Sequence, residues 1–180
     1  TKVKNITALS GLTQLTILEL DNTPIRDAGV IAALTQLMTL DMSGTEISDV
    51  NSLAGLGNLL TLNLNSTAIS DLSPLAGLAK LTRLDLNDTP VETIDSLAEM
   101  TELTHLEIRG AHVNGVAALA NMTELVYLDL AQNRVSSIDS LAGLTKIRHL
   151  NLAGNQINDI TALASLASLW YLDVKDNPIS

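Results

Sequence analysis

Residues 122–143 read MTELVYLDLAQNRVSSIDSLAG and residues 144–165 read LTKIRHLNLAGNQINDITALAS, so the same pattern returns after 22 residues. Writing the whole chain in lines of 22 from Leu12 aligns these two lines with six others, without insertion or deletion. Positions 4, 7, 9 and 14 of the line are apolar throughout, and position 21 is Ala in every complete line. A fixed period with this fidelity predicts a repeat protein made of similar stacked units.

The repeat divides residues 1–180 into one array rather than into several domains. We number positions within a repeat from 1, and the eight repeats start at residues 12, 34, 56, 78, 100, 122, 144 and 166, the last being incomplete. Thr1 falls at position 12 and Ser180 at position 15, so the sequence starts and stops inside a repeat. Because solenoids cover their end layers with polar caps, we expect this domain to be a fragment of a longer protein.

Each repeat predicts one short strand and one tight return. Positions 7 and 9 have the same parity, so in an extended segment both side chains point to one side while positions 6, 8 and 10 point to the other. This predicts a strand of about three to five residues with one buried face. Asp occupies position 16 in four repeats, where a short carboxylate caps a helical or 3-10 turn; these residues are Asp27, Asp49, Asp71 and Asp159.

Stacking such units predicts an α/β repeat fold. Each strand lies parallel to the next at about 4.8 Å, because only the neighbouring repeat covers its apolar face. The product is a curved, right-handed solenoid, with a parallel β-sheet on the concave face and short helical or 3-10 turns on the convex face. We expect core layers at positions 4, 7, 9, 14, 17 and 20.

The pattern resembles that of the leucine-rich-repeat family. The family hallmark LxxLxLxxN is present at residues 125–133, LVYLDLAQN, and at residues 147–155, IRHLNLAGN. Residues 69–77, ISDLSPLAG, and 157–164, INDITALA, are most similar to the 22-residue bacterial repeats found in internalins. The resemblance covers the whole chain and implies a non-catalytic protein-binding module.

One family position departs from this pattern. The Asn that the family carries at position 12 is present as Asn133, Asn155 and Asn177, but the first four repeats have Thr there and the fifth has Ala111. In the family this Asn bonds the backbone across successive turns, which Thr does in part and Ala does not. We therefore expect the ladder to be interrupted at Ala111, with local looseness over residues 110–115.

Composition excludes several classes of function. The chain has 20 acidic against 10 basic residues and a net charge of −10, which disfavours nucleic acid and anionic membranes as partners. It has no Cys, which excludes thiolate metal sites and cysteine nucleophiles. No apolar run approaches the length that spans a bilayer.

The sequence offers no catalytic constellation and no cofactor site. His105 and His149 share position 6 but lie two repeats apart, about 10 Å at the strand spacing, which is too far for one metal. His112 has no partner at ligand spacing, and GxSxG, HExxH and glycine-rich phosphate loops are absent. We predict that the chain is not an enzyme and holds no metal.

Two columns of the predicted concave face carry chemistry. Position 8 has six carboxylates and two amides, among them Glu107, Asp129 and Asp173. These form either an electrostatic surface for a basic partner or simply a solvated strand face. Position 6 changes from Ile and Thr to large amphipathic side chains in the second half of the chain, and all three aromatic residues of the protein lie in positions 5 and 6.

Arg, Tyr and Trp are enriched at interaction hot spots. The predicted partner-binding residues are Arg83, His105, Arg109, Tyr127, Arg148, His149, Trp170, Tyr171, Glu107, Asp129 and Asp173. Two alternatives stay open: an ordinary surface, and a role for Trp170 in covering the end of the solenoid.

The function predicted from these features is binding of a protein partner on the concave face, and a functional acidic column at position 8 would select a basic partner. The alternative is a regulatory or targeting repeat domain attached to an enzyme elsewhere in the full-length chain. The resemblance to internalins implies a protein secreted by a bacterium or held at its cell surface.

Overall fold

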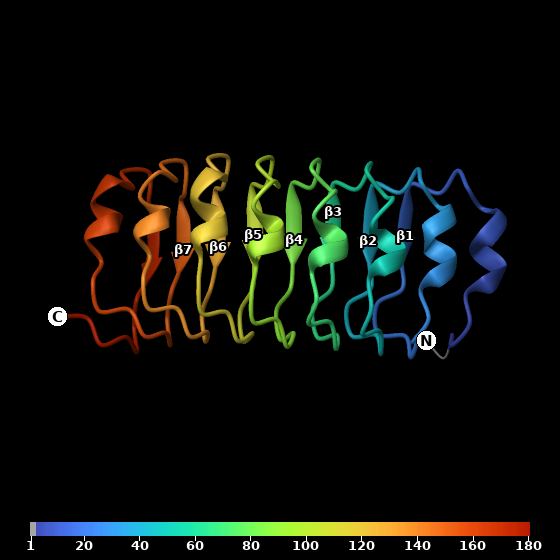
Figure 1. Cartoon of the computed structure of the whole chain (residues 1–180), viewed down its shortest axis with the longest axis horizontal. Coiled ribbons are helices and arrows are strands. Elements are labelled where there is room, and N and C mark those ends of the chain that lie inside the picture. The colour runs from blue at the N-terminus through green and yellow to red at the C-terminus, as the bar shows by residue number, and fades with distance from the viewer. Residues whose placement is uncertain (1–2) are drawn as a thin grey trace.

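The repeats form an elongated stack with all strands on one side (Figure 1). The computed structural model describes residues 3–180; Thr1, with its predicted place at position 12, lies outside the described residues. One sheet runs in the order β1 to β8, with every neighbouring pair parallel. In Figure 1 the row of turns extends beyond the row of strands at both ends, so the strands line the inner, concave side of the curve.

Each strand covers three residues, positions 6 to 8 of its repeat, at the short end of the predicted range. The strands are β1 Ile17–Glu19, β2 Thr39–Asp41, β3 Thr61–Asn63, β4 Arg83–Asp85, β5 His105–Glu107, β6 Tyr127–Asp129, β7 His149–Asn151 and β8 Tyr171–Asp173. Pairing follows the 22-residue register, since Leu62 lies opposite Leu84 and Leu84 opposite Leu106. Equivalent side chains therefore form straight rows across the sheet.

The return limb of every repeat contains a 3-10 turn on the convex side. The turns are η1 Thr7–Gly11, η2 Gly29–Ala33, η3 Asn51–Leu53, η4 Ser73–Leu75, η5 Asp95–Leu97, η6 Ala117–Asn121, η7 Asp139–Leu141 and η8 Thr161–Ser165. The predicted caps are present: Asp71 Oδ1 accepts the Ser73 N–H at 2.8 Å and Asp159 Oδ1 accepts the Thr161 N–H at 2.8 Å. Hydrogen bonds lower the pKa of both carboxyls: for Asp159 the bond from the Thr161 hydroxyl acts most and that from its N–H next, and for Asp71 the bond from the Ser73 N–H acts most and that from its hydroxyl next.

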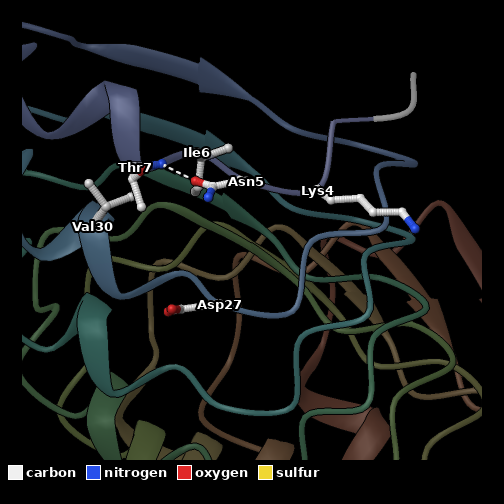
Figure 2. Close-up of a pocket in the computed structure, with 6 residues that line it drawn as sticks. All are labelled: Lys4, Asn5, Ile6, Thr7, Asp27 and Val30. Carbon is white, nitrogen blue, oxygen red and sulfur yellow. Dashed lines mark hydrogen bonds between the residues drawn. The ribbon is translucent and has the colours of Figure 1, made fainter.

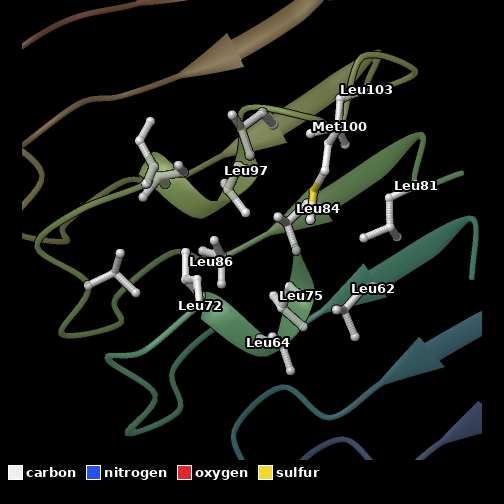
Figure 3. Close-up of a cluster of buried hydrophobic side chains, with 14 of the residues drawn as sticks. Leu62, Leu64, Leu72, Leu75, Leu81, Leu84, Leu86, Leu97, Met100 and Leu103 are labelled. Carbon is white, nitrogen blue, oxygen red and sulfur yellow. The ribbon is translucent and has the colours of Figure 1, made fainter. Parts of the chain in front are cut away.

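The core fills the space between the sheet and the turns. In the middle repeats the side chains at positions 4, 7, 9, 14, 17 and 20 are buried as predicted, and position 1 joins them. Figure 3 shows this packing, where Leu84 of β4 points toward Met100 and Leu75 of η4 lies beneath it. The apolar layers are more open at the two ends, where Leu12 is 50% exposed and Leu172 is 43% exposed.

The position 12 ladder differs from the prediction. Asn155 bridges repeats, because its Nδ2 donates to Leu130 O at 2.9 Å and its Oδ1 accepts the Val135 N–H at 3.0 Å. Thr67 Oγ1 instead donates to Leu64 O at 2.7 Å, within its own repeat. The expectation that Thr partly bridges turns is wrong, because its short side chain reaches only the carbonyl three residues back.

The inter-repeat ladder of position 12 side chains therefore comes from Asn133, Asn155 and Asn177 alone among residues 3–180. Ala111 is buried, and the sheet continues past it, with β5 paired to β6. The predicted looseness over residues 110–115 stays a prediction.

Position 11 has a backbone requirement that the sequence pattern did not reveal. All eight residues there have a positive φ; they are Asn22, Gly44, Ser66, Asp88, Gly110, Gln132, Gly154 and Asp176. This left-handed residue turns the chain out of the strand and toward the return limb. Because five of the eight are not Gly, the column is not recognisable as a glycine position.

Candidate functional site

The aromatic strip, defined as His105, Tyr127, His149 and Tyr171, crosses the concave face of β5 to β8. The strands pair these residues one to the next in register. Ring centroids lie 5.9 Å apart for His105 and Tyr127, 4.2 Å for Tyr127 and His149, and 4.1 Å for His149 and Tyr171. The planes are within 15° of parallel, so the strand spacing sets up a continuous face-to-face stack.

Trp170 extends the strip at the C-terminal end. Its ring stands edge-on to His149 at 6.0 Å and to Tyr171 at 6.3 Å, and the residue is 73% exposed. This exposure disfavours the alternative in which Trp170 covers the end of the solenoid, because a covering side chain buries itself against the last core layer. The indole is presented to solvent beside the strip.

Arg83 and Glu107 border the strip on the side of His105. Arg83 Nη2 donates to Glu107 Oε1 at 2.7 Å, and Arg83 Nε donates to Asp85 Oδ2 at 2.9 Å. Asn87 Nδ2 donates to the other Glu107 oxygen at 2.8 Å. Both oxygens of Glu107 are therefore occupied within the chain.

His105 is held in one tautomer by its hydrogen bond with the neighbouring Thr104. The Thr104 hydroxyl donates to Thr82 O at 3.0 Å, so the His105 Nδ1–H donates to Thr104 Oγ1 at 2.9 Å and Nε2 is left as an acceptor. Burial, and to a smaller extent the Arg83 charge, lower the pKa of His105. This shift favours the neutral form of the ring.

Position 8 carboxylates next to the strip accept hydrogen bonds within the chain; besides Glu107, these are Asp129 and Asp173. Asp129 is buried; its Oδ1 accepts the Ala131 N–H at 2.9 Å and its Oδ2 accepts from Asn151 Nδ2 at 3.0 Å. Asp173 Oδ1 accepts the Lys175 N–H at 3.0 Å. These bonds cap the ends of the strands, which supports a structural role for the column.

Asp85, at the same position on β4, differs from these carboxylates in being buried with one oxygen unbonded within residues 3–180. It is only 4% exposed, and its Oδ1 has no hydrogen-bond partner among the described residues. The N–H that serves this oxygen in other repeats belongs here to Asn87, and it donates to Asn65 Oδ1 at 2.6 Å instead. Burial raises the pKa of Asp85, while its bond with Arg83 opposes the rise.

Two guanidinium groups flank the strip without a carboxylate partner. Arg109 at position 10 and Arg148 at position 5 are both exposed. The ion pairs of the described residues are Arg26–Glu46, Arg83–Asp85, Arg83–Glu107, Lys146–Glu124 and Lys175–Asp173, and neither arginine belongs to one. The strip is thus flanked by free cations.

Among residues 3–180, no three His, Asp, Glu or Cys side chains come together in a way that would hold a metal ion. His112 lies exposed in a loop away from the strip. None of the helices in the same range is both long and apolar enough for a membrane span.

A hollow near the N-terminal end of the convex face is lined by Lys4, Asn5, Ile6, Thr7, Asp27 and Val30 (Figure 2). Thr7 N–H donates to Asn5 Oδ1 at 2.8 Å across it. In Figure 2 the Lys4 amine extends away from the Asp27 carboxylate, so the two charges do not converge on a common point.

The sequence pattern located the stacked rings but not the network around them. Asn65, Asn87 and Thr104 were missed, although each occupies a position that flanks a strand. Asn at position 10 in two successive repeats was the available signal, because amides in register bridge neighbouring strands. Glu107 is bonded to Arg83 and Asn87, and Asp129 to Ala131 and Asn151. These bonds depend on side-chain geometry, which the spacing of residues in the sequence does not give.

Comparison with known proteins gives consistent matches to leucine-rich repeats. A family model described as leucine rich repeats (2 copies) matches residues 58–99 and 123–165. A comparison with curated protein sequences finds no match.

Solved structures similar to this one include internalins of Listeria monocytogenes. Internalin C2 shares 36% sequence identity at a TM-score of 0.95, with 97% of this chain and 77% of that chain covered. Internalin inlF shares 32% identity at a TM-score of 0.92, covering 96% of this chain but 51% of that one, so the chain spans about half of this relative.

A plant peptide hormone receptor, RGFR1 in complex with RGF2, has the same fold at 21% identity and a TM-score of 0.85, covering 97% of this chain and 30% of that chain.

Proposed function

Because this chain belongs to the internalin family of leucine-rich-repeat proteins, we propose that it binds a protein partner on the concave face of its sheet, without catalysis. The binding site is centred on the aromatic strip and on Trp170. Relatives from Listeria further support the proposal that the protein acts at the surface of a bacterium or outside it.

The stacked strip is the observation that carries this proposal. Tyr and Trp supply much of the energy at protein interfaces, because each buries a large area while losing few rotamers. Here the neighbouring rings at 4.1 and 4.2 Å already hold Tyr127, His149 and Tyr171 in place. A partner therefore meets a preorganised surface and pays little conformational entropy to order it.

The fold itself is compatible with this use. A plant receptor with the same fold is in complex with its ligand RGF2. The strip also lies on the strand face, where residues of adjacent repeats stand side by side and present one continuous row to a single partner.

The test is the sensitivity of a captured partner to substitutions in position 6. Proteins retained by the immobilised chain are assayed against Tyr127→Ala and Tyr171→Ala, which we expect to weaken binding by about 2 kcal/mol or more each, as hot-spot truncations do. Thr39→Ala and Thr61→Ala, in the same column on β2 and β3, are the matched controls and should leave affinity nearly unchanged. Losses confined to the two threonines would place the site elsewhere and reject the proposal.

A further inference from the structure

We propose that the segment of the partner held by the aromatic strip is acidic, with Asp or Glu side chains that meet Arg148, Arg109 and the hydroxyls of Tyr127 and Tyr171. This rests on the proposed function and names the chemistry of the partner at the same site. It departs from the sequence-based expectation of a basic partner, which depended on free carboxylates at position 8.

The geometry of the stack is the first argument. With planes within 15° of parallel, each inner ring covers the faces of its neighbours and leaves only edges toward solvent. The face of an aromatic ring is its negative region and the edge its positive region. Both faces of the inner rings, Tyr127 and His149, are therefore covered against cations, whereas carboxylate oxygens can meet their positive edges.

The carboxylates beside the strip are the second argument. Glu107 has both oxygens bonded to Arg83 and Asn87, and Asp129 is buried with both oxygens bonded. Asp173 accepts a backbone N–H and lies 3.6 Å from the Lys175 amine. A basic partner segment would have to break these bonds before it gained a counter-ion.

The free donors are the third argument. Arg109 and Arg148 are exposed and outside every ion pair of the described residues. Burial, with the charges of Glu107 and Asp129, raises the pKa of Tyr127, so its hydroxyl stays protonated and able to donate. Donors without acceptors on one surface fit a partner rich in acceptors.

The N-terminal half of the same face has the opposite character. Glu19 and Asp21 are exposed on and just after β1, and no arginine or lysine occupies positions 5, 6, 8 or 10 of the first three repeats. An acidic segment is therefore repelled there and directed to β5 to β8. The two halves of one sheet discriminate by charge as well as by aromatic content.

The test uses a random 12-residue peptide library displayed on phage and selected on the full chain. Peptides whose binding depends on Tyr127 and Tyr171 should be enriched in Asp and Glu over the unselected library. For these peptides we expect Arg148→Glu to weaken binding at least tenfold. Arg134→Glu, the same charge change at an exposed arginine beyond the strands, should leave affinity unchanged.

One further protein variant and one altered peptide separate the charge effect from a loss of folding. Tyr127→Phe keeps the ring stack and removes only the hydroxyl, so it should weaken acidic peptides several-fold in a protein that melts like the wild type. A peptide with its acids replaced by Lys should regain affinity for the Arg148→Glu protein.

The outcomes separate the two proposals. Strip-dependent peptides rich in Lys or Arg, with binding retained in Arg148→Glu, would overturn the acidic partner and leave the concave-face site standing. A selection in which no peptide depends on Tyr127 or Tyr171 would count against the site itself.

Discussion

At the scale of single residues, position 11 imposes the most uniform demand in the molecule. Each repeat turns at a residue with φ between 52° and 68°, a conformation that costs a side chain about 1 kcal/mol or more unless the residue is Gly. The fold accepts this cost at Asn, Asp, Ser and Gln in five repeats. The turn geometry is therefore set by the fold and not by local preference.

Gly154→Ala tests this demand without a steric complication. At φ +68°, the added Cβ would meet only Gln132 atoms at 3.5 Å or more, so we expect a loss of about 1 kcal/mol from backbone strain alone. Gly143→Ala is the matched control, because its Cβ would lie 3.9 Å from Ala120 O and its φ is not positive. Urea melts of both variants give the comparison; an equal loss in the two would show that the left-handed turn is not the cause.

The position 12 side chains make a second residue-scale contrast. Asn155→Ala leaves the Val135 N–H of the preceding repeat without its partner and removes the bonds from Asn155 Nδ2 to the Leu130 and Leu152 carbonyls, although Leu130 O keeps its bond from Asn133 Nδ2. We expect a loss of about 3 kcal/mol. Thr67→Ala removes one bond inside a repeat and should cost about 1 kcal/mol. Denaturant unfolding measures both, and a larger loss for the Thr67 variant would contradict the account of the ladder.

Asp85 gives a pH dependence with a definite sign. Since burial raises its folded-state pKa above 3.8, the folded protein retains this proton over a range in which the unfolded chain has lost it, and stability falls as pH rises through that window. Asp85→Asn removes the buried charge, so its stability relative to wild type should be more favourable at pH 7 than at pH 3. Melts of both proteins at the two pH values decide this, and a difference of opposite sign would show that the ion pair with Arg83 outweighs burial.

At the scale of elements, stability resides in the rows of Leu between strand and turn. Leu84 on β4 is fully buried, and its truncation to Ala should cost about 2–5 kcal/mol through lost contacts and the cavity left behind. Thr61→Ala, on the outer side of the neighbouring β3, should cost well under 1 kcal/mol. Similar losses in chemical melts would mean that the inner and outer faces of the strands are reversed.

The strands and the core could be predicted from the sequence, whereas the strand length and the side-chain hydrogen bonds could not. The apolar residues at positions 7 and 9 predict the strands and the core, because the same alternation recurs in all eight repeats. An ambiguous residue in one repeat therefore does not change the prediction for the others. The strand length was less certain, since the left-handed residue that turns the chain at position 11, three residues after each strand, is of mixed identity. The pairing of Glu107 with Arg83 and Asn87 was beyond reach, because it depends on rotamers and not on spacing.

At the scale of the whole molecule, the sheet is uniform in backbone and divided in chemistry. All eight strands pair in the same register, yet among residues 3–180 the rings stack only across β5 to β8. The net charge of −10 gives the chain a repulsive field toward acidic partners at long range. We therefore expect recognition to depend on contacts at the strip. The association rate constant should be modest, and partners should differ mainly in their dissociation rate constants.

Site-specific crosslinking to a bound partner tests this division most directly. A photoreactive phenylalanine analogue replaces Tyr127 or Tyr171 on the concave face, and in separate proteins Ser73 or Asp95 in the convex turns η4 and η5. We predict covalent capture of the partner from positions 127 and 171 and none from 73 and 95. Capture from the convex positions alone would contradict a concave-face binding site.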